Sequence, residues 1–271
     1  MSILNSILLG ILQGLTEFLP VSSSGHLVLA ESLLGIRIRG DIAFEVFLHL
    51  GTLFSIVTLY RKELLLMTES VAHTIGSPFT FAEHYRKDEH LRLAWYIVLA
   101  TIPAVVAGLL FEHQIEATFS DPKLVADMLL ITGIILFLTR FARPRVEGNP
   151  CAARSFLIGI GQAVAMLPGI SRSGSTISAA LYLGVGREEA ARFSFLLAVP
   201  VIAGAALLKS KELYASHTTL TDILPLLTGG VTAYVIGLAA IKLLLRVVRK
   251  GKLSWFAAYC IAVGITALVL L

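Results

Sequence analysis

Charged residues are scarce in this sequence of 271 residues: Asp, Glu, Lys and Arg together make up 15%, whereas hydrophobic residues make up 56%. The mean hydropathy of +0.83 lies well above that of a soluble domain of this length. This scarcity excludes an ordinary soluble protein and indicates a polytopic membrane protein. The net charge of +4 does not predict nucleic-acid binding, because basic residues between apolar spans set membrane topology instead.

Cysteine is also rare. Cys151 lies beside a basic loop and Cys260 within the last apolar stretch, so the two predict neither a disulfide framework nor a metal motif. No Lys or Arg precedes Arg37, and Glu17 interrupts the N-terminal apolar run. A secretory signal peptide has a basic start and an apolar core. We therefore expect this run to belong to the mature fold.

Long apolar stretches dominate what is present. A helix of about 20 residues crosses roughly 30 Å of hydrocarbon, which predicts transmembrane helices over 41–60, 92–112, 121–141, 187–208, 221–245 and 254–271. Two further apolar regions, 3–35 and 152–184, are interrupted near the middle by Pro, Gly and Ser. Their halves are too short to span the bilayer, so each region predicts a re-entrant helix pair.

The charged segment 61–91 contains FAEHYRKDEH, with His84 and His90 among acidic residues. Its composition admits two interpretations, a metal-binding tract and a solvated cytoplasmic loop. We adopt the solvated loop, because a run of mixed charges is ordinarily a surface exposed to water.

The two interrupted regions align with each other without gaps. The corresponding pairs are Gly10 and Gly159, Gln13 and Gln162, Ser22 and Ser171, Ser24 and Ser173, and Gly25 and Gly174. Three predicted spans follow each region, and an odd number inverts the second copy. The fold class expected is therefore an all-α polytopic integral membrane protein with an inverted-topology repeat, each half a re-entrant helix pair plus three transmembrane helices. We expect one membrane domain over 1–271, with repeats at about 1–141 and 152–271.

The distribution of Lys and Arg predicts the orientation. The segments 61–92, 140–154, 187 and 246–252 carry most of these residues, whereas the opposite side holds Arg37, Arg39, Lys123, Lys209 and Lys211. Cytoplasmic loops are the richer in Lys and Arg. We therefore expect both termini outside the cell, the first re-entrant pair entering from outside and the second from the cytoplasm.

The first interruption carries residues able to do chemistry, in GLTEFLPVSSSGH from Gly14 to His26. Gln13 and Glu17 stand four residues apart and share a helix face. Ser22, Ser23 and His26 add hydroxyls and a base. A solvated Glu at the membrane interface is the alternative interpretation of Glu17.

The second interruption reads LPGISRSGST, from Leu167 to Thr176. Glycines allow close backbone approach, and Ser or Thr at a helix start leaves N–H groups facing an anion. Arg172 adds a planar guanidinium that matches phosphate oxygens. A snorkelling arginine with serine caps is the alternative, although the tip of an apolar hairpin leaves it little room to snorkel.

The first full span carries Glu45 and His49, again four residues apart. A charge near the centre of a membrane helix costs about 2.5 to 3.5 kcal/mol, so we expect Glu17, Glu45 and Arg172 to face one another or a common cleft. A cleft with an arginine, carboxylates and a Ser/His pair is an inventory for phosphoryl transfer. The residues alone predict a membrane-embedded site for an anionic, phosphorylated, lipidic ligand.

The two motifs together, in a chain of this length and hydropathy, resemble the bacterial undecaprenyl-diphosphate phosphatases of the bacitracin-resistance type. The resemblance implies hydrolysis of undecaprenyl diphosphate to the monophosphate carrier lipid for cell-wall synthesis, in the bacterial cytoplasmic membrane, by a homodimer. The partners that it implies are the polyisoprenyl diphosphate lipid and the bilayer. The runner-up is an inverted-repeat transporter or flippase for a phosphorylated lipid, which would not require a clustered nucleophile and base.

The resemblance also implies roles for individual residues. Glu17, Ser23, His26 and Arg172 become the catalytic candidates, and the phosphate-binding candidates are Ser22, Ser171, Arg172, Ser173 and Thr176. A divalent cation, Mg2+ or Ca2+, is expected near Glu17. Gln13 stands where many members carry a second glutamate, so its amide oxygen is a ligand candidate but no acid or base. Ser23 is the expected nucleophile, with direct attack by water as the alternative, and the site is expected to open outward.

Overall fold

The computed structural model describes residues 2–34, 42–76, 81–143, 148–215 and 220–271, which form helices joined by turns, with no strand among them. The helices of the first half are α1 (Ile3–Thr16), α2 (Ser23–Leu34), α3 (Ile42–Leu59), α4 (Arg61–Gly76), α5 (Phe81–Lys87), α6 (Glu89–Thr118), α7 (Pro122–Leu138) and the 3-10 turn η2 (Thr139–Phe141). Those of the second half are α8 (Ala152–Val164), α9 (Arg172–Tyr182), α10 (Arg187–Ala215), α11 (Leu220–Arg249) and α12 (Ser254–Leu270).

Within this described part, four helices are long and apolar enough to cross a membrane, or up to five if α3 and α4, which meet at a bend of 82°, count as one span. Several helices place apolar side chains on the outer surface, as lipid contact requires. The chain is therefore a multi-pass membrane protein. The predicted span 254–271 corresponds to α12, whose 17 residues reach only about 25 Å at 1.5 Å rise per residue.

Local sequence signals explain where several helices begin. Ser2 caps α1 by accepting the N–H of Asn5, and Asp88 caps α6 by accepting the N–H groups of His90 and Leu91. Asp121 caps α7 in the same way and is followed by Pro122 in the first turn, where a missing N–H costs nothing. These caps satisfy backbone donors that would otherwise be left without partners.

Both interrupted regions fold as two short helices around a non-helical link, as the sequence predicts. In the first link, between α1 and α2, Ser22 adopts a positive φ of 68°. In the second link, between α8 and α9, Gly169 has a φ of 92°, and a Cβ there would lie 2.3 Å from the carbonyl oxygen of Val125. Glycine is therefore required at position 169 both by conformation and by space.

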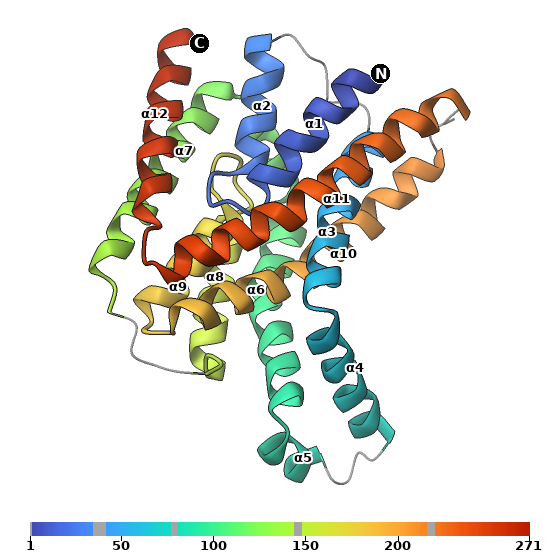
Figure 1. Cartoon of the computed structure of the whole chain (residues 1–271), viewed down its shortest axis with the longest axis vertical. Coiled ribbons are helices and arrows are strands. Elements are labelled where there is room, and N and C mark those ends of the chain that lie inside the picture. The colour runs from blue at the N-terminus through green and yellow to red at the C-terminus, as the bar shows by residue number, and fades with distance from the viewer. Residues whose placement is uncertain (1, 35–41, 77–80, 144–147, 216–219) are drawn as a thin grey trace.

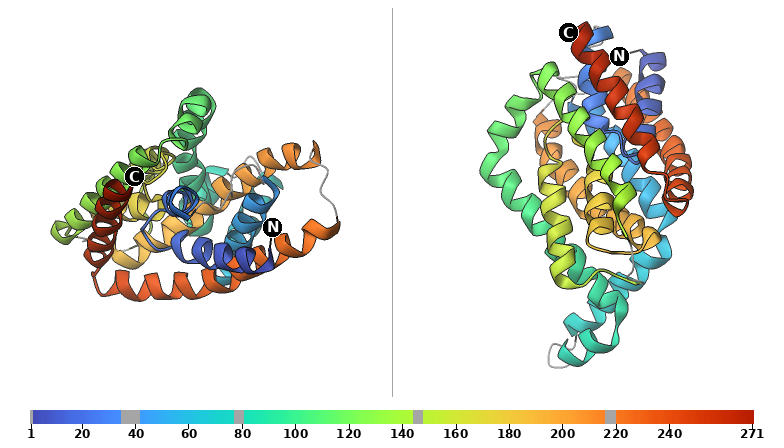
Figure 2. Two further views of the ribbon diagram at one scale, coloured as in Figure 1. Left: turned by 90° about the horizontal axis from the view of Figure 1, so that it is seen from above. Right: turned by 90° about the vertical axis from the view of Figure 1, so that its left-hand side faces the viewer.

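The segment 61–91 departs from the sequence prediction. It forms α4, α5 and the start of α6, which extend from the helix body as an antiparallel projection (Figure 1). Both chain termini lie at the opposite end of the molecule (Figures 1 and 2). An exposed ion pair of 2.7 Å joins Lys87 to Glu83 on α5. The loop was thus predicted wrongly: the backbone is helical, because charged residues four apart also support a helix. The exposure of this segment to water stays a prediction. Arg37, Arg39 and Arg145, used to predict orientation, lie outside the described residues.

Glycines set the closest helix crossings. A Cβ at Gly51 of α3 would lie 2.1 Å from the carbonyl oxygen of Gly230 on α11, and one at Gly10 of α1 would lie 2.6 Å from that of Gly229. A Cβ at Gly159 of α8 would lie 2.2 Å from the carbonyl oxygen of Ala100 on α6. Such crossings are typical of membrane helices, where small residues let backbones pack directly. The remaining large contacts join α7 to α12 and α3 to α10.

Candidate active site

The two helix links meet in the interior. Arg172, the first residue of α9, forms an ion pair with Glu17 at the end of α1, its Nη2 donating to Oε1 of the carboxylate. The Ser173 hydroxyl donates to the carbonyl oxygen of Leu19 over 3.3 Å. A Cβ added at Gly25 would lie 3.0 Å from the Cα of Gly169. The two motifs that the sequence singles out therefore form one site.

Glu17 is the centre of this site. Its Oε2 accepts hydrogen bonds from the Ser23 hydroxyl at 2.6 Å and from the Gln13 amide at 3.0 Å. The side chain of Glu17 is 6% exposed and that of Arg172 17%. Both carboxylate oxygens thus have partners, and the guanidinium neutralises the charge. Ion pairing and hydrogen bonding together are what make a buried charge tolerable.

Gln13 contributes an oxygen without a partner. Its side chain is fully buried, its amide nitrogen donates to Glu17, and its Oε1 has no hydrogen-bond partner. Buried polar atoms are almost always paired, so an unpaired amide oxygen beside a carboxylate offers a place to a cation or water. Among the described residues no group of three His, Cys, Asp or Glu side chains gathers to hold a metal. Glu17 and Gln13 are neighbouring oxygen donors that could hold Mg2+ or Ca2+ if substrate and water supplied the other ligands.

The start of α9 is fixed by hydroxyls. Ser171 caps the helix by accepting the N–H of Gly174 at 3.1 Å, and its own N–H donates to the Thr132 hydroxyl at 3.1 Å. Thr132 in turn donates to the carbonyl oxygen of Gly169 at 2.9 Å. Thr132, which the sequence analysis did not single out, thereby ties the second link to α7. An isolated Thr in an apolar span is no signal in a sequence.

The predicted phosphate-binding hydroxyls differ in their surroundings. Thr176 bonds to the carbonyl oxygen of Arg172 at 2.8 Å and to the Ser194 hydroxyl on α10 at 2.6 Å. Ser22 accepts the N–H of Gly25 at 3.2 Å and so caps α2. Ser22, Ser171 and Thr176 therefore hold helix starts and neighbouring helices in place. Ser173, by contrast, connects the two links directly, through its hydrogen bond to the carbonyl oxygen of Leu19.

His26 lies beside this cluster without a bond to Ser23 or Glu17. Its Nδ1 lies 2.8 Å from the carbonyl oxygen of Ser22, one turn back along the chain. Its Nε2 lies 2.8 Å from the hydroxyl of Tyr259 on α12. Ser23 is thus paired with Glu17, and His26 with Tyr259. The sequence analysis missed Tyr259, because an aromatic residue in an apolar span is usually a lipid or packing contact.

Glu45 and His49 both lie on α3. Glu45 forms an ion pair of 2.8 Å with Lys209 on α10, and both side chains are about two-fifths exposed. His49 places its Nδ1 2.9 Å from the carbonyl oxygen of Glu45 and interacts electrostatically with Glu17. The structure thus joins Glu17 to Arg172 and pairs Glu45 with Lys209. Glu45 was expected to face Glu17 and Arg172, but its ion pair is with Lys209, which directly follows the apolar stretch 187–208.

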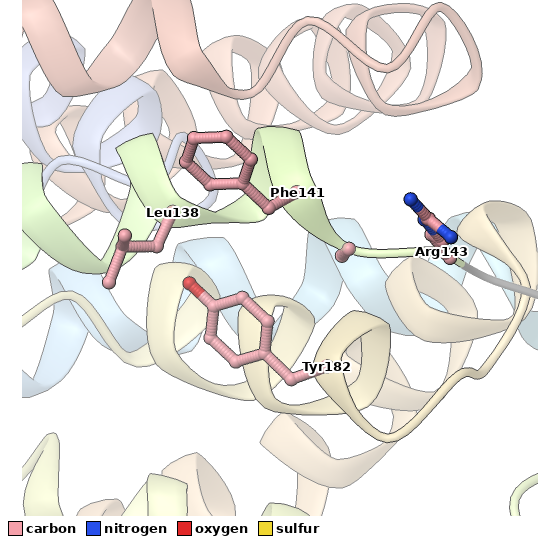
Figure 3. Close-up of a pocket in the computed structure, with 5 residues that line it drawn as sticks. Leu138, Phe141, Arg143 and Tyr182 are labelled. Atoms are coloured by element: carbon pink, nitrogen blue, oxygen red, sulfur yellow. The ribbon is translucent and has the colours of Figure 1, made fainter.

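A cavity of about 500 Å³ lies elsewhere, between the end of α7 and the end of α9 (Figure 3). It is lined by Leu138, Phe141, Ala142, Arg143 and Tyr182. The Tyr182 hydroxyl donates to the carbonyl oxygen of Ile135. None of the candidate catalytic residues lines this cavity, so its size does not make it the site of the chemistry.

Comparison with known proteins agrees with the motifs. The family model described as "Bacitracin resistance protein BacA" matches residues 6–266. An undecaprenyl-diphosphatase of Desulforapulum autotrophicum is 42% identical over 99% of this chain and 98% of its own length. Proteins of the same name from Salinibacter ruber and Desulfosudis oleivorans are 42% and 45% identical, each over 96% of both chains. With a match over nearly its whole length, this chain belongs to the BacA family of bacitracin resistance proteins.

Proposed function

We propose that this protein hydrolyses undecaprenyl diphosphate to undecaprenyl phosphate and inorganic phosphate, recycling the carrier lipid for cell-wall synthesis and conferring bacitracin resistance. The family and the names of its relatives support this activity. The observation that carries it is the junction of the two links. Ser23, Glu17 and Arg172 form a continuous chain of contacts there, joining a nucleophile, a carboxylate and an anion-binding group.

Binding of the diphosphate begins at Arg172 and the N-terminus of α9. The guanidinium offers paired donors to phosphate oxygens, and the helix start adds N–H groups and the positive end of its dipole. Arg172 already bonds to Glu17, so the incoming phosphate shares or takes over the guanidinium. Contact with substrate thus releases Glu17 Oε1 for a further role.

Ser23 then attacks the terminal phosphorus. The Ser23 proton passes to Glu17 Oε2, which it already contacts at 2.6 Å, and the new O–P bond replaces the bond to the bridging oxygen. Undecaprenyl phosphate leaves with the bridging oxygen and its electron pair. In the second step water attacks the phosphorus of the phosphoserine and His26 accepts the water proton. The bond between phosphorus and the Ser23 oxygen breaks, Glu17 returns its proton to Ser23, and phosphate departs. Direct attack by water, with Ser23 as a hydrogen-bond donor only, is the alternative route.

A divalent cation, Mg2+ or Ca2+, is proposed at Glu17 and the amide oxygen of Gln13. When bound, such a cation would neutralise charge on the diphosphate. The unpaired, fully buried Oε1 of Gln13 supports this placement. Gln13 also donates to Glu17, so it orients the carboxylate whether or not a cation is present.

We further propose that the fold is an inverted repeat. The matched glycines support it, because Gly10 of α1 packs on α11 of the other half and Gly159 of α8 packs on α6 of the other half. The helices α11 and α6 correspond to each other, because each is the middle one of the three spans that follow the re-entrant pair of its half. The pairs α3 with α10 and α7 with α12, which match in order between the halves, also pack on each other. These reciprocal contacts are what a two-fold axis in the membrane plane produces.

The proposed setting is the bacterial cytoplasmic membrane, with both termini and the opening of the active site facing outward. The position of α4 and α5 at the end opposite the termini (Figure 1) and the concentration of Lys and Arg on that side support this orientation. A homodimer is proposed from the family resemblance. A transporter or flippase is the second candidate, because the same reciprocal helix contacts occur in transporters.

The deciding experiment is phosphate release from a long-chain polyprenyl diphosphate by purified protein in detergent, with and without a chelator. We expect metal-dependent release by the wild type and none by Arg172→Ala. Arg249→Ala is the matched control, since Arg249 has an exposed ion pair with Glu188 far from the links. A folded wild-type protein that releases no phosphate would contradict the phosphatase and favour transport.

A further inference from the structure

His26 has both ring nitrogens engaged, and the partners fix its tautomer. The carbonyl oxygen of Ser22, 2.8 Å from Nδ1, can only accept a hydrogen bond. Nδ1 of the neutral imidazole therefore carries the proton, and Nε2 presents its lone pair. The Tyr259 hydroxyl, 2.8 Å from Nε2, is then the donor. Nε2 is thus the basic atom of His26, and Tyr259 is the group that holds it.

Tyr259 is brought to His26 by the packing of α12 against the first link. The neighbouring residue, Cys260, is fully buried and its Sγ donates to the carbonyl oxygen of Pro20 at 3.6 Å. Cys260 and Ala257 also pack with Val21 in one apolar cluster. Because Pro20 and Val21 lie between Glu17 and Ser23, α12 is registered on the same stretch of chain that carries the catalytic candidates.

The Tyr259 ring has a second contact with His26 and a free side. The two rings are nearly parallel, with 6° between their planes and 5.6 Å between their centroids. The side chain is 45% exposed, and in the part of the chain that is described its hydroxyl bonds to His26 alone. The Tyr259 ring is thus half exposed, while its hydroxyl is engaged by the partly buried His26.

We propose that Tyr259 relays the water proton to His26 in the second step: its hydroxyl passes a proton to Nε2, which it already contacts, as its oxygen accepts the proton of the attacking water. The proposal rests on the phosphatase function proposed above. It assigns separate tasks to two pairs, Glu17 with Ser23 for attack and Tyr259 with His26 for hydrolysis. The division follows from the contacts, because Ser23 bonds to Glu17 and not to His26.

The first test compares Tyr259→Phe with the wild type in the phosphate-release assay. The substitution removes the hydroxyl and keeps the ring contact with His26. We expect kcat to fall about tenfold or more, with KM and melting temperature unchanged, since the lost hydroxyl acts in the chemical step and the ring is kept. Tyr234→Phe is the matched control, because the Tyr234 hydroxyl on α11 lies 3.3 Å from the hydroxyl of Thr58 and is not bonded to His26. Wild-type kcat in Tyr259→Phe, or a rise in KM alone, would overturn the proposal.

The second test does not need activity. Diethyl pyrocarbonate acylates an unprotonated imidazole nitrogen, and the Tyr259 hydroxyl protects Nε2 of His26. We expect carbethoxylation of His26, followed by peptide mass spectrometry, to be several-fold faster in Tyr259→Phe than in wild type or Tyr234→Phe. Equal rates would refute the contact. If the wild type releases no phosphate, the proposed function fails, and this comparison still decides whether Tyr259 holds His26.

Discussion

Arg172 donates to Oε1 of Glu17 although the two residues lie 155 positions apart in the sequence. They come from different halves of the chain, one at the end of α1 and the other at the start of α9. The pair is buried and is also the junction of the two helix links. One contact therefore joins the two links, and we propose that it also has a catalytic task; substitutions can separate the two.

Arg172→Ala should abolish phosphate release and destabilise the protein. Removing one partner of a buried ion pair leaves the other charge unpaired, which costs about 3 to 5 kcal/mol. The double variant Glu17→Gln with Arg172→Ala removes both charges and should recover thermal stability without activity. Melting temperature and phosphate release in parallel measure the two tasks. Equal stability of single and double variants would show that the pair has no structural task.

Ser23→Ala should lower kcat by roughly 100-fold or more if Ser23 is the nucleophile, since covalent catalysis is lost with it. Ser24→Ala is the control, because Ser24 bonds to Ser22 and not to Glu17. Trapping of a phosphorylated Ser23 by rapid quench would identify the intermediate. Retained turnover in Ser23→Ala together with its loss in His26→Ala would favour direct attack by water.

Gln13→Glu should lower the Mg2+ or Ca2+ concentration that gives half-maximal activity, because a second carboxylate beside Glu17 binds a hard cation more tightly than an amide. The corresponding residue of the other half, Gln162, is also buried and lacks partners. Gln162→Glu is therefore the matched control and should leave the metal requirement unchanged. A metal titration that is the same for Gln13→Glu and wild type would place the cation elsewhere.

Gly51→Ala should destabilise the crossing of α3 and α11, since the added Cβ would lie 2.1 Å from a backbone oxygen. Overpacking of this kind costs about 1 to 3 kcal/mol. Gly204→Ala on α10 is the control, because nothing lies within 4 Å of a Cβ there. Thermal unfolding in detergent measures both. A melting temperature in Gly51→Ala equal to that of Gly204→Ala would refute the close crossing.

The two native cysteines report orientation without any substitution. Cys151, before α8, is exposed, whereas Cys260 is buried. With the proposed orientation, a membrane-impermeant maleimide should label Cys151 in inside-out vesicles and leave it unlabelled in intact cells. Denatured protein, in which both thiols react, sets the maximum signal. Labelling of Cys151 in intact cells would reverse the proposed orientation.

Hydropathy and helix breakers predict much of this fold. The interruptions near Pro20 and Gly169 are visible because Pro, Gly and Ser stand inside apolar sequence, and α1, α2, α8 and α9 form around them as predicted. The helices α4 and α5 were predicted as a loop, because charge indicates exposure to water but does not distinguish loop from helix. The helix α12 was predicted as a span but is not among the helices long enough to cross a membrane, because its apolar run is shorter than a typical span.

The site was predictable only within each motif. Gln13 and Glu17 were expected on one face because their spacing is local, and they do bond. The bond between His26 and Tyr259 joins positions 233 apart. It depends on how α12 packs along α7, which no local sequence pattern determines. The pairing of Glu45 with Lys209 depends likewise on the packing of α3 against α10.

The Glu17–Arg172 contact also has a consequence for how the protein is made. A ribosome adds about 5 to 20 residues per second, so the 155 positions between the two residues take roughly 8 to 30 s to synthesise. During this interval Glu17 has been synthesised but its partner Arg172 has not. The Glu17 carboxylate therefore has no arginine partner until α9 is made, and the addition of α9 completes the ion pair.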